Sequence, residues 1–317
     1  MSCAADTMNG FVNLLKPSRM SSHDAVAFFR RISGIERVGH TGTLDPMAVG
    51  VLPLCVGKAT RVMSYFAPEN KRYRCEMKLG IVTNTQDVWG RMISRARPGF
   101  AKHLSERLIT ETAASFVGPQ MQTPPLYSAV RIRGKRLYEY AREGETVVIP
   151  SRKIKIFSIK VKHFDSARAV VRFEAECSQG TYMRTLCHDW GRMLGCGAAM
   201  SGLIRMRSGV FKLEDAHTVE ELAAAFSSED LPEHILTPMD EPLRELPAVW
   251  LSAEPAGLFS NGMRIEPSSY NVAMRRLAAP RDFCRVYGDA GRRGLVFLGV
   301  GKFQNDTLCP ARVFLRI

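Results

Sequence analysis

The sequence contains no long hydrophobic run. No stretch of about 18 consecutive apolar residues, the length that a spanning helix needs, occurs in the 317 residues. Cysteine is scarce: the eight cysteines include no Cys-x-x-Cys pair, which argues against a disulfide scaffold and against a structural zinc site. The N-terminus lacks the basic start and apolar block of a secretory signal and the composition of a transit peptide. We therefore expect a cytoplasmic protein with reduced thiols, no bound metal and no membrane association.

Motifs for nucleotide-driven and hydrolytic chemistry are absent as well. Gly57-Lys58 lacks two features of a phosphate-binding loop, because Leu52 stands where the earlier glycine belongs and Ala59 where Ser or Thr belongs. The sequence has no Gly-x-Ser-x-Gly and no His-Glu-x-x-His. It therefore predicts no nucleotide cofactor, no serine hydrolase site and no zinc peptidase site.

Acidic residues are outnumbered by basic ones. The chain has 44 Lys and Arg against 31 Asp and Glu, a net charge of +13 and a pI near 9.6. Such an excess favours a polyanionic partner, and nucleic acid ahead of a membrane. Residues 126–162 hold ten basic and three acidic residues, a net charge of +7. A solvated basic face would have the same composition, so charge alone leaves both interpretations open.

Hydrophobic periodicity predicts an α/β core followed by a small β-rich module. Strands are expected at 11–16, 71–82, 154–163 and 168–177, with another strand in 127–134 that ends in a turn. Helices are expected at about 22–32, 104–117, 137–144, 181–194 and 218–226, and a glycine-punctuated loop at 34–42. Residues 228–247 contain four prolines and predict a linker, after which residues 248–317 form the β-rich module.

The segment from Gly39 to Pro53 holds the main candidate for chemistry. Glycines and prolines that control the backbone surround one imidazole, His40, and one carboxylate, Asp45. Pro46 disfavours a helix at Asp45, so this carboxylate lies in a turn or in extended chain. A carboxylate on a rigid loop can act as nucleophile or general base. A turn aspartate that binds its own backbone is the alternative, and these residues alone do not exclude it.

Five blocks of sequence resemble those of the TruB-type pseudouridine synthases, in the family's order and over most of residues 10–215. The segment around Asp45 is similar to the catalytic motif of that family. The other blocks are Lys16-Pro17 with Met20-Ser21-Ser22, Lys71-Arg72-Tyr73-Arg74 with Leu79-Gly80, Pro124–Ala129 with Gly134–Gly144, and Cys177–Thr185 followed by Leu203 and Arg205. Four positions depart from the usual pattern: Arg19, Thr43, Asn84 and Gln179. The final module resembles a PUA-type RNA-binding domain.

The resemblance implies an α+β fold, the pseudouridine synthase fold, with a central mixed and mainly antiparallel sheet flanked by helices. Residues 1–244 would form the catalytic domain, and residues 245–317 a small PUA-like domain. The implied reaction isomerises the T-loop uridine at position 55 of tRNA to pseudouridine after the base is flipped out. The bond from N1 to C1′ breaks, the base rotates and C5 joins C1′, which needs no cofactor. Assistance to tRNA folding is a second activity compatible with the resemblance.

The resemblance also assigns roles to residues in the site. Asp45 is the essential residue, which either attacks C1′ or removes the 2′ proton. Arg184 is expected to pair with Asp45 through both guanidinium nitrogens and to keep it ionised, with phosphate contact as its alternative role. Tyr73 would stack its ring on the uracil. Leu203 would line the uracil pocket, and Lys16 and Pro17 would shape the pocket floor.

RNA recognition is expected to depend on the folded T arm of tRNA, the implied partner. His40 would fill the space that the flipped nucleotide leaves. The candidates for contact with the RNA backbone are Arg131, Arg133, Lys135 and Arg136. We expect a monomer, because a tRNA-sized ligand needs no symmetric partner. We expect no obligate protein partner, because the blocks are uninterrupted. An RNA-guided synthase and a non-catalytic RNA-binding protein are the competing interpretations.

Overall fold

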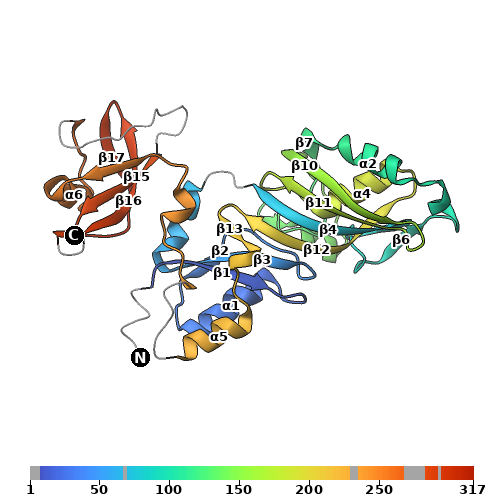
Figure 1. Cartoon of the computed structure of the whole chain (residues 1–317), viewed down its shortest axis with the longest axis horizontal. Helices are drawn as coiled ribbons and strands as arrows, with labels where there is room; N and C mark the ends of the chain where they lie inside the picture. The colour runs from blue at the N-terminus through green and yellow to red at the C-terminus, as the bar shows by residue number, and fades with distance from the viewer. Residues whose placement is uncertain (1–7, 67–69, 229–234, 268–282, 292–293) are drawn as a thin grey trace.

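A computed structural model describes residues 8–66, 70–228, 235–267, 283–291 and 294–317. The N-terminal residues 1–7, which bear on targeting signals, and residues 229–234 of the expected linker lie outside the described residues. The chain forms a large part built on a nine-stranded sheet and a smaller part built on a four-stranded sheet (Figure 1). No helix of the described residues is long and apolar enough to cross a membrane.

The large sheet is mixed and mainly antiparallel, which confirms the expected fold class. Its strand order is β1 (Gly10–Lys16), β3 (Val49–Val56), β12 (Ala198–Ser208), β4 (Lys71–Leu79), β11 (Val170–Cys177), β10 (Arg152–Asp165) and β7 (Gly118–Gln122). Two short strands join it at the side: β2 (Val38–His40) pairs with β3, and β13 (Phe211–Lys212) pairs with β12. The contact of β3 with β12 is parallel, whereas the other pairs are antiparallel.

Helices flank this sheet (Figure 1). Two short hairpins form separate two-stranded sheets. The α-helices of this part are α1 (Ser22–Ser33), α2 (Glu106–Ala114), α3 (Leu137–Glu143), α4 (Met183–Met193) and α5 (Val219–Ser227). The hairpins are β5 (Ile81–Thr83) with β6 (Met92–Arg95), and β8 (Arg131–Ile132) with β9 (Lys135–Arg136). Short 3-10 helices cover Gly57–Arg61, Met63–Tyr65, Phe100–His103, Leu213–Asp215 and Glu241–Leu243.

Local sequence explains the two helices that lie nearest the candidate site. Helix α1 begins with a capping box, in which Ser21 and Asp24 satisfy each other's backbone N–H groups, and it ends at Gly34 with a φ of 68°. Helix α4 buries Trp190, whose ring lies 5.1 Å from that of Phe173 on β11. This aromatic contact holds α4, and with it the first-turn residue Arg184, against the sheet.

The C-terminal part is β-rich, as expected. Its sheet has the order β14 (Ala248–Leu251), β15 (Phe283–Asp289), β16 (Leu295–Gln304) and β17 (Thr307–Val313), and α6 (Ala253–Ser260) packs on it. A hydrophobic cluster joins the two parts, since it includes Phe11 and Val51 from the large sheet and Phe314 from the C-terminal part. Lys58 also donates to the carbonyl of Phe314 at 2.8 Å.

Several boundaries differ from those predicted. The expected loop at 34–42 contains β2, and the strand expected in 127–134 is reduced to the two residues of β8. Strand β12 was not predicted, although it lies between β3 and β4, because Gly202 and the charged Arg205 and Arg207 interrupt its hydrophobic pattern.

The seven cysteines described are free thiols, and five of them are buried.

Candidate active site

Four residues predicted to lie in the site come together in one pocket. Its volume is about 240 Å³, and its lining includes Asp45, Tyr73, Arg184 and Leu203. Asp45 lies on the loop between β2 and β3, Tyr73 on β4, Leu203 on β12 and Arg184 at the start of α4. The centre of the sheet and one helix end therefore build the pocket from segments that are far apart in the sequence.

The loop that carries Asp45 is held in place from the N-terminal side. The hydroxyl of Ser22 donates to the carbonyl of Leu44 at 3.0 Å and accepts from its N–H at 2.8 Å. The ammonium group of Lys16 donates to the carbonyls of Pro17, Met20 and Pro46 at 2.8, 2.6 and 3.4 Å. Lys16 is wholly buried and is not in the pocket lining, so its contacts connect the first block of the sequence to the loop beneath Asp45.

Arg205 holds the same loop from the sheet, a function that sequence reasoning missed. Its guanidinium is wholly buried and donates to the carbonyls of Gly42, Thr43 and Val51 at 3.0, 3.2 and 2.7 Å. Gly50 has a φ of 113°, and a Cβ there would lie 2.4 Å from the carbonyl oxygen of Arg205. The backbone of β12 can approach the loop this closely only because residue 50 is glycine.

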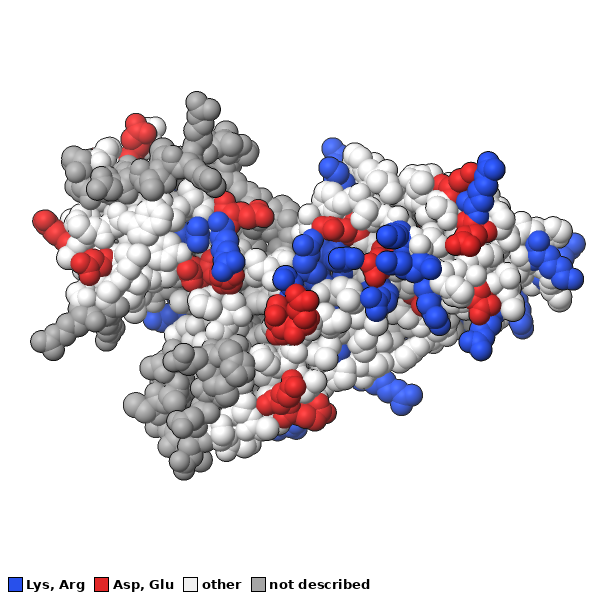
Figure 2. All heavy atoms as spheres, viewed as in Figure 1, with Lys and Arg blue, Asp and Glu red and all other residues white. Residues whose placement is uncertain are grey.

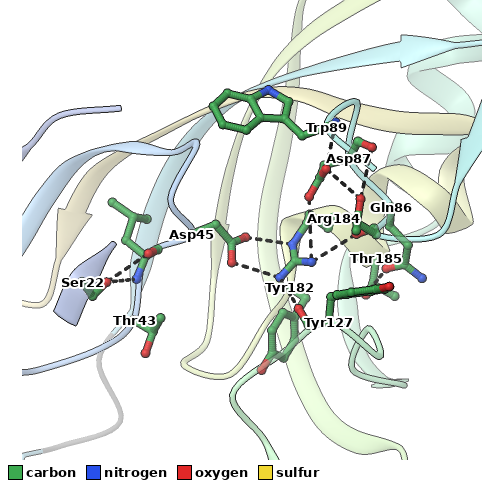
Figure 3. A network of polar contacts seen from close by, with 12 residues as sticks. Ser22, Thr43, Asp45, Gln86, Asp87, Trp89, Tyr127, Tyr182, Arg184 and Thr185 are labelled. Carbon is green, nitrogen blue, oxygen red and sulfur yellow. Dashed lines mark hydrogen bonds and ion pairs between the residues drawn. The ribbon is translucent and has the colours of Figure 1, made fainter. Parts of the chain in front are cut away.

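Arg184 makes the bidentate contact with Asp45 that the resemblance implied (Figure 3). Its Nε donates to Oδ2 at 2.8 Å and its Nη2 to Oδ1 at 3.0 Å. Two carbonyls hold the same guanidinium, that of Thr85 at 3.1 Å from Nη1 and that of Tyr127 at 3.0 Å from Nη2. The Arg184 side chain is 5% exposed and that of Asp45 is 28% exposed. The arginine is therefore fixed inside the protein, while the carboxylate keeps an open side toward the pocket.

Asp87 is a second carboxylate near Arg184, and the sequence analysis did not identify it. Its Oδ2 lies 3.9 Å from Nη1 of Arg184, and its Oδ1 accepts from the Thr85 hydroxyl at 2.8 Å and from the Trp89 N–H at 3.0 Å. The carboxylate thus orders the loop that supplies the Thr85 carbonyl to Arg184. The available sequence signal was an aspartate between the polar Thr83–Gln86 run and Gly90.

We expect Asp87→Ala to lower turnover by about 10- to 100-fold, because a loosened loop lets the Arg184–Asp45 pair shift. RNA affinity should stay within about threefold of the wild type, since Asp87 is not in the pocket lining. Single-turnover kinetics and filter binding measure the two quantities. Asp87→Asn retains one acceptor oxygen for the loop and should lose less turnover than Asp87→Ala. Wild-type turnover of Asp87→Ala would contradict this positioning role.

Tyr73 lies with its side chain toward the pocket and is 6% exposed. Burial raises the pKa of Tyr73 to about 12. The phenol therefore keeps its proton at neutral pH and is available as a hydrogen-bond donor. Leu203 is 8% exposed and provides an apolar wall in the same pocket.

The burial of Lys16 predicts a pH-dependent stability. Burial lowers the pKa of Lys16 from 10.5 to about 8, so between these values the folded chain holds it neutral while the unfolded chain protonates it. Because the unfolded state then binds more protons, this group makes stability rise with pH, by about 3 kcal/mol across the interval. Urea unfolding of the wild type and of Lys16→Met at several pH values measures it. Parallel curves for the two proteins would refute the prediction.

His40 lies on β2, just before the Asp45 loop and outside the pocket lining. Burial, followed by the charges of Arg205 and Lys71, lowers the pKa of His40, so the imidazole is neutral at neutral pH. Its Nδ1 is buried and has no hydrogen-bond partner among the described residues. Its expected role in replacing the flipped nucleotide stays a prediction.

The basic segment 126–162 divides into two regions. Ser128 and Ala129 line the pocket, and the hairpin β8–β9 follows them directly. Arg131 and Arg133 on this hairpin are exposed, and Arg136 donates to the Tyr138 hydroxyl at 2.8 Å. Lys135, in contrast, is already paired with Glu143 and Glu145. The remaining basic residues of the segment lie mainly on β10, away from the pocket lining.

Comparison with known proteins places these features in a family. Three family models match the chain: "TruB family pseudouridylate synthase (N terminal domain)" at residues 30–183, "tRNA pseudouridylate synthase B C-terminal domain" at 184–244, and "Pseudouridine synthase II TruB, C-terminal" at 247–314. A protein of Alkaliphilus oremlandii named tRNA pseudouridine synthase B is 43% identical over 299 residues, 94% of each chain. The chain belongs to the TruB family.

Other relatives also match nearly the whole length of this TruB protein. A tRNA pseudouridine synthase B of Clostridium novyi is 40% identical over 310 residues, which cover 97% of this chain and 100% of the relative. Among solved structures, a chain from the "Crystal Structure of a Cbf5-Nop10-Gar1 Complex" is 27% identical with a TM-score of 0.69, and the match covers 97% of this chain and 85% of that chain. Both parts of the fold therefore have relatives of known structure.

One departure from the TruB sequence pattern has a structural consequence. Arg19 stands where the family usually has glycine, and its φ is 67°, in the left-handed region that glycine tolerates best. Its N–H donates to the carbonyl of Pro46 at 2.8 Å. This TruB chain thus keeps the turn that contacts the Asp45 loop while bearing a long cationic side chain there.

The structure offers no evident metal site to this TruB protein. In the ranges that the structure describes, no group of three or more His, Cys, Asp or Glu side chains is placed to hold an ion. The pocket lining includes the carboxylate of Asp45, the guanidinium of Arg184, the phenol of Tyr73 and the apolar side chain of Leu203.

Proposed function

We propose that this chain isomerises the T-loop uridine of tRNA to pseudouridine, with Asp45 as the catalytic residue. The observation that carries the proposal is the bidentate contact of Arg184 with Asp45 in a pocket that Tyr73 and Leu203 complete. Similarity to proteins named tRNA pseudouridine synthase B over nearly the whole chain supports the same reaction class.

The geometry suits a reaction that needs an ionised carboxylate near a sugar carbon. Arg184 stabilises the negative charge of Asp45, while the exposed side of the carboxylate is open to the pocket. Asp45 either attacks C1′ or removes the 2′ proton, and the bond from C1′ to N1 breaks. The freed uracil turns and C5 bonds to C1′, which releases the Asp45 carboxylate on the first route and is accompanied by return of the proton to C2′ on the second. The proton then leaves C5 and N1 becomes protonated. Nothing is oxidised or reduced overall.

Tyr73 and Leu203 hold the base during this rotation. The Tyr73 ring supplies a flat surface for stacking, and Leu203 supplies an apolar surface in the same pocket. A pocket of about 240 Å³ within the sheet suits a single base and not a base pair, so the uridine must leave its stack to enter.

Binding of tRNA should depend steeply on salt concentration. Arg131 and Arg133 are exposed on the hairpin that adjoins the pocket, and a net charge of +13 attracts the RNA backbone. We expect the affinity for a tRNA transcript to fall by about 100-fold or more between 50 and 200 mM salt, the behaviour of several phosphate contacts. Fluorescence anisotropy measures it. A flat response would contradict the electrostatic component of recognition.

The decisive experiment is tritium release from a T-arm transcript that carries C5-labelled uridine. Wild-type protein should release one tritium per RNA without any added guide RNA, nucleotide or metal. A transcript with cytidine at the target and label elsewhere should release none. No release from the T arm would refute the proposed function, and release only with a guide RNA would favour an RNA-guided enzyme.

We further propose that the chain acts as a monomer in the cytoplasm without an obligate protein partner. A tRNA-sized ligand needs no symmetric partner, and the two sheets share one hydrophobic cluster. Light scattering of the purified protein at assay concentration, together with its turnover, tests the monomer. Turnover that rises with the dimer fraction would overturn it.

A further inference from the structure

A larger cavity lies outside the candidate active site, at the far end of β4. Its volume is about 740 Å³. Three segments build it: the junction of β4 and β5, the chain from the end of β6 to the 3-10 helix Phe100–His103, and the turn between β10 and β11. We call it the basic pocket, because its lining includes five cationic side chains and no carboxylate: Lys78, Arg95, Arg97, Lys102 and Arg168.

The positive charge of the basic pocket is largely uncompensated. Among the described residues, Arg168 is the one cation of the set that forms an ion pair, since its Nε lies 3.8 Å from Oδ2 of Asp165. The charge of Lys78 also interacts with the Glu76 carboxylate. Lys78 donates to the carbonyl of Arg168. Within the part of the chain that the structure describes, Arg95, Arg97 and Lys102 form no ion pair, and all three are exposed. Lys and Arg side chains mark this end of the molecule in Figure 2.

The backbone under the basic pocket is built to hold this shape. Gly80 has a φ of 80°, and a Cβ there would lie 2.4 Å from the ring of Phe100. Phe100 therefore packs directly on the backbone at residue 80 and fixes the segment that carries Arg97 and Lys102. The N–H of Ala96 also donates to the carbonyl of Gly80 at 2.9 Å.

The hairpin β5–β6 connects the basic pocket to the active site. The loop at its tip supplies the Thr85 carbonyl to Arg184, whereas Ile81 and Arg95 at its base pair with each other and line the basic pocket. Strand β4 also spans the two sites, because Tyr73 lines the active-site pocket and Lys78 lines the basic pocket. At about 3.3 Å per residue, these two residues are about 17 Å apart along the strand. A nucleic acid with one nucleotide in the active site can therefore reach the basic pocket within a few nucleotides.

The outer strand of this hairpin has the composition of an RNA-binding surface. Each residue of β6 is exposed, including Met92 at 52% and Ile93 at 62%. Trp89 is 57% exposed at the end near Asp87, and Arg91 follows it. Exposed aromatic and basic side chains in alternation are typical of surfaces on which RNA bases stack and phosphates bind.

We propose that the basic pocket binds backbone phosphates of the tRNA substrate, as a second RNA contact beyond the active site. It rests on the proposed function for the identity of the RNA. Exposed cations from three segments bind a single phosphate weakly. A polyanion such as RNA binds more strongly, because several phosphates are contacted at once and counterions are released from each of them. A free phosphate or pyrophosphate shares the same chemistry, so the experiment must distinguish these sources.

The test compares two double variants that remove the same charge. Arg95→Gln/Arg97→Gln removes two cations of the basic pocket, and Arg31→Gln/Arg244→Gln removes two exposed arginines elsewhere. We expect the first variant to raise the Kd for full-length tRNA by about tenfold and to reduce the slope of log K against log salt by about 1.5. The control variant should match the wild type. Arg97→Glu, a single charge reversal, should also weaken binding by about tenfold.

Three outcomes would overturn the proposal. The first is an unchanged Kd of the pocket variant for tRNA, and the second is an equal loss of tRNA affinity in the control variant. The third is a pocket variant that no longer binds pyrophosphate in calorimetry but keeps the wild-type affinity for tRNA. The variants' melting curves show that each is folded. If the proposed function is wrong, wild-type protein releases no tritium from the T-arm transcript. The comparison of tRNA affinities between the variants still tests the basic pocket in that case.

Discussion

Asp45→Asn is expected to abolish isomerisation, with a loss of turnover of about 10⁴-fold or more, the scale seen when a catalytic nucleophile or base is removed. Asparagine has nearly the same shape, but its amide is neutral and can neither attack C1′ nor take the 2′ proton. Its NH₂ group would also face a donor nitrogen of Arg184, where Asp45 now presents two acceptor oxygens. Tritium release from the T-arm transcript measures the effect.

RNA binding should survive the same substitution. The exposed arginines of the hairpin β8–β9 and the pocket walls are unchanged, so the Kd for tRNA should stay within about threefold. Asp189→Asn, on α4 and paired with Arg192 near the surface, is the matched control and should keep full turnover. Release by Asp45→Asn at more than about one hundredth of the wild-type rate would remove Asp45 from its proposed role.

Arg184→Lys is expected to have the second largest effect. Lysine keeps the charge, but its single ammonium group cannot make both contacts with Asp45 and also reach the carbonyls of Thr85 and Tyr127. We expect turnover to fall by about 10²- to 10³-fold, because Asp45 loses its fixed orientation. Unfolding in urea should show a loss of about 1–3 kcal/mol, since buried carbonyls lose their donors.

A conservative change elsewhere on the same helix provides the comparison. Arg192→Lys alters a side chain that is 75% exposed, and we expect wild-type turnover and stability. If Arg184→Lys keeps more than one tenth of the wild-type turnover, charge alone is sufficient at this position. The bidentate geometry would then have no role in orienting Asp45.

Elements with a clear hydrophobic period were predictable from the sequence. The alternation in Lys71–Leu79 places Tyr73, Cys75 and Met77 on the buried side, as a half-buried strand requires. Strand β12 was not predictable in this way. Its Arg205 is wholly buried because two loop carbonyls and one carbonyl of β3 accept its hydrogen bonds, and those acceptors come from a segment about 160 residues away in the sequence.

The residues of the site also divide into those that the sequence predicted and those that it did not. The family blocks pointed to Asp45, Tyr73, Arg184 and Leu203, and the structure brings these four into one pocket. Asp87, Arg205 and the carbonyls of Thr85 and Tyr127 were missed. Every residue has a backbone carbonyl, so the residue type does not show which carbonyls accept from an arginine. Only the folded structure shows which of them lie next to a given guanidinium.

The amino-acid sequence by itself indicated the class of partner through its family blocks, because the excess of basic residues alone left a solvated basic face as an alternative. The sequence also contains no Cys-x-x-Cys pair and no His-Glu-x-x-His motif. Composition does not show, however, where each charged side chain lies in the folded protein or which charges are paired. Tertiary structure divided the basic segment 126–162, left Lys135 paired with two glutamates, and gathered five other cations into the basic pocket. Charge is a property of each residue, whereas its compensation depends on which side chains the fold brings within a few ångströms.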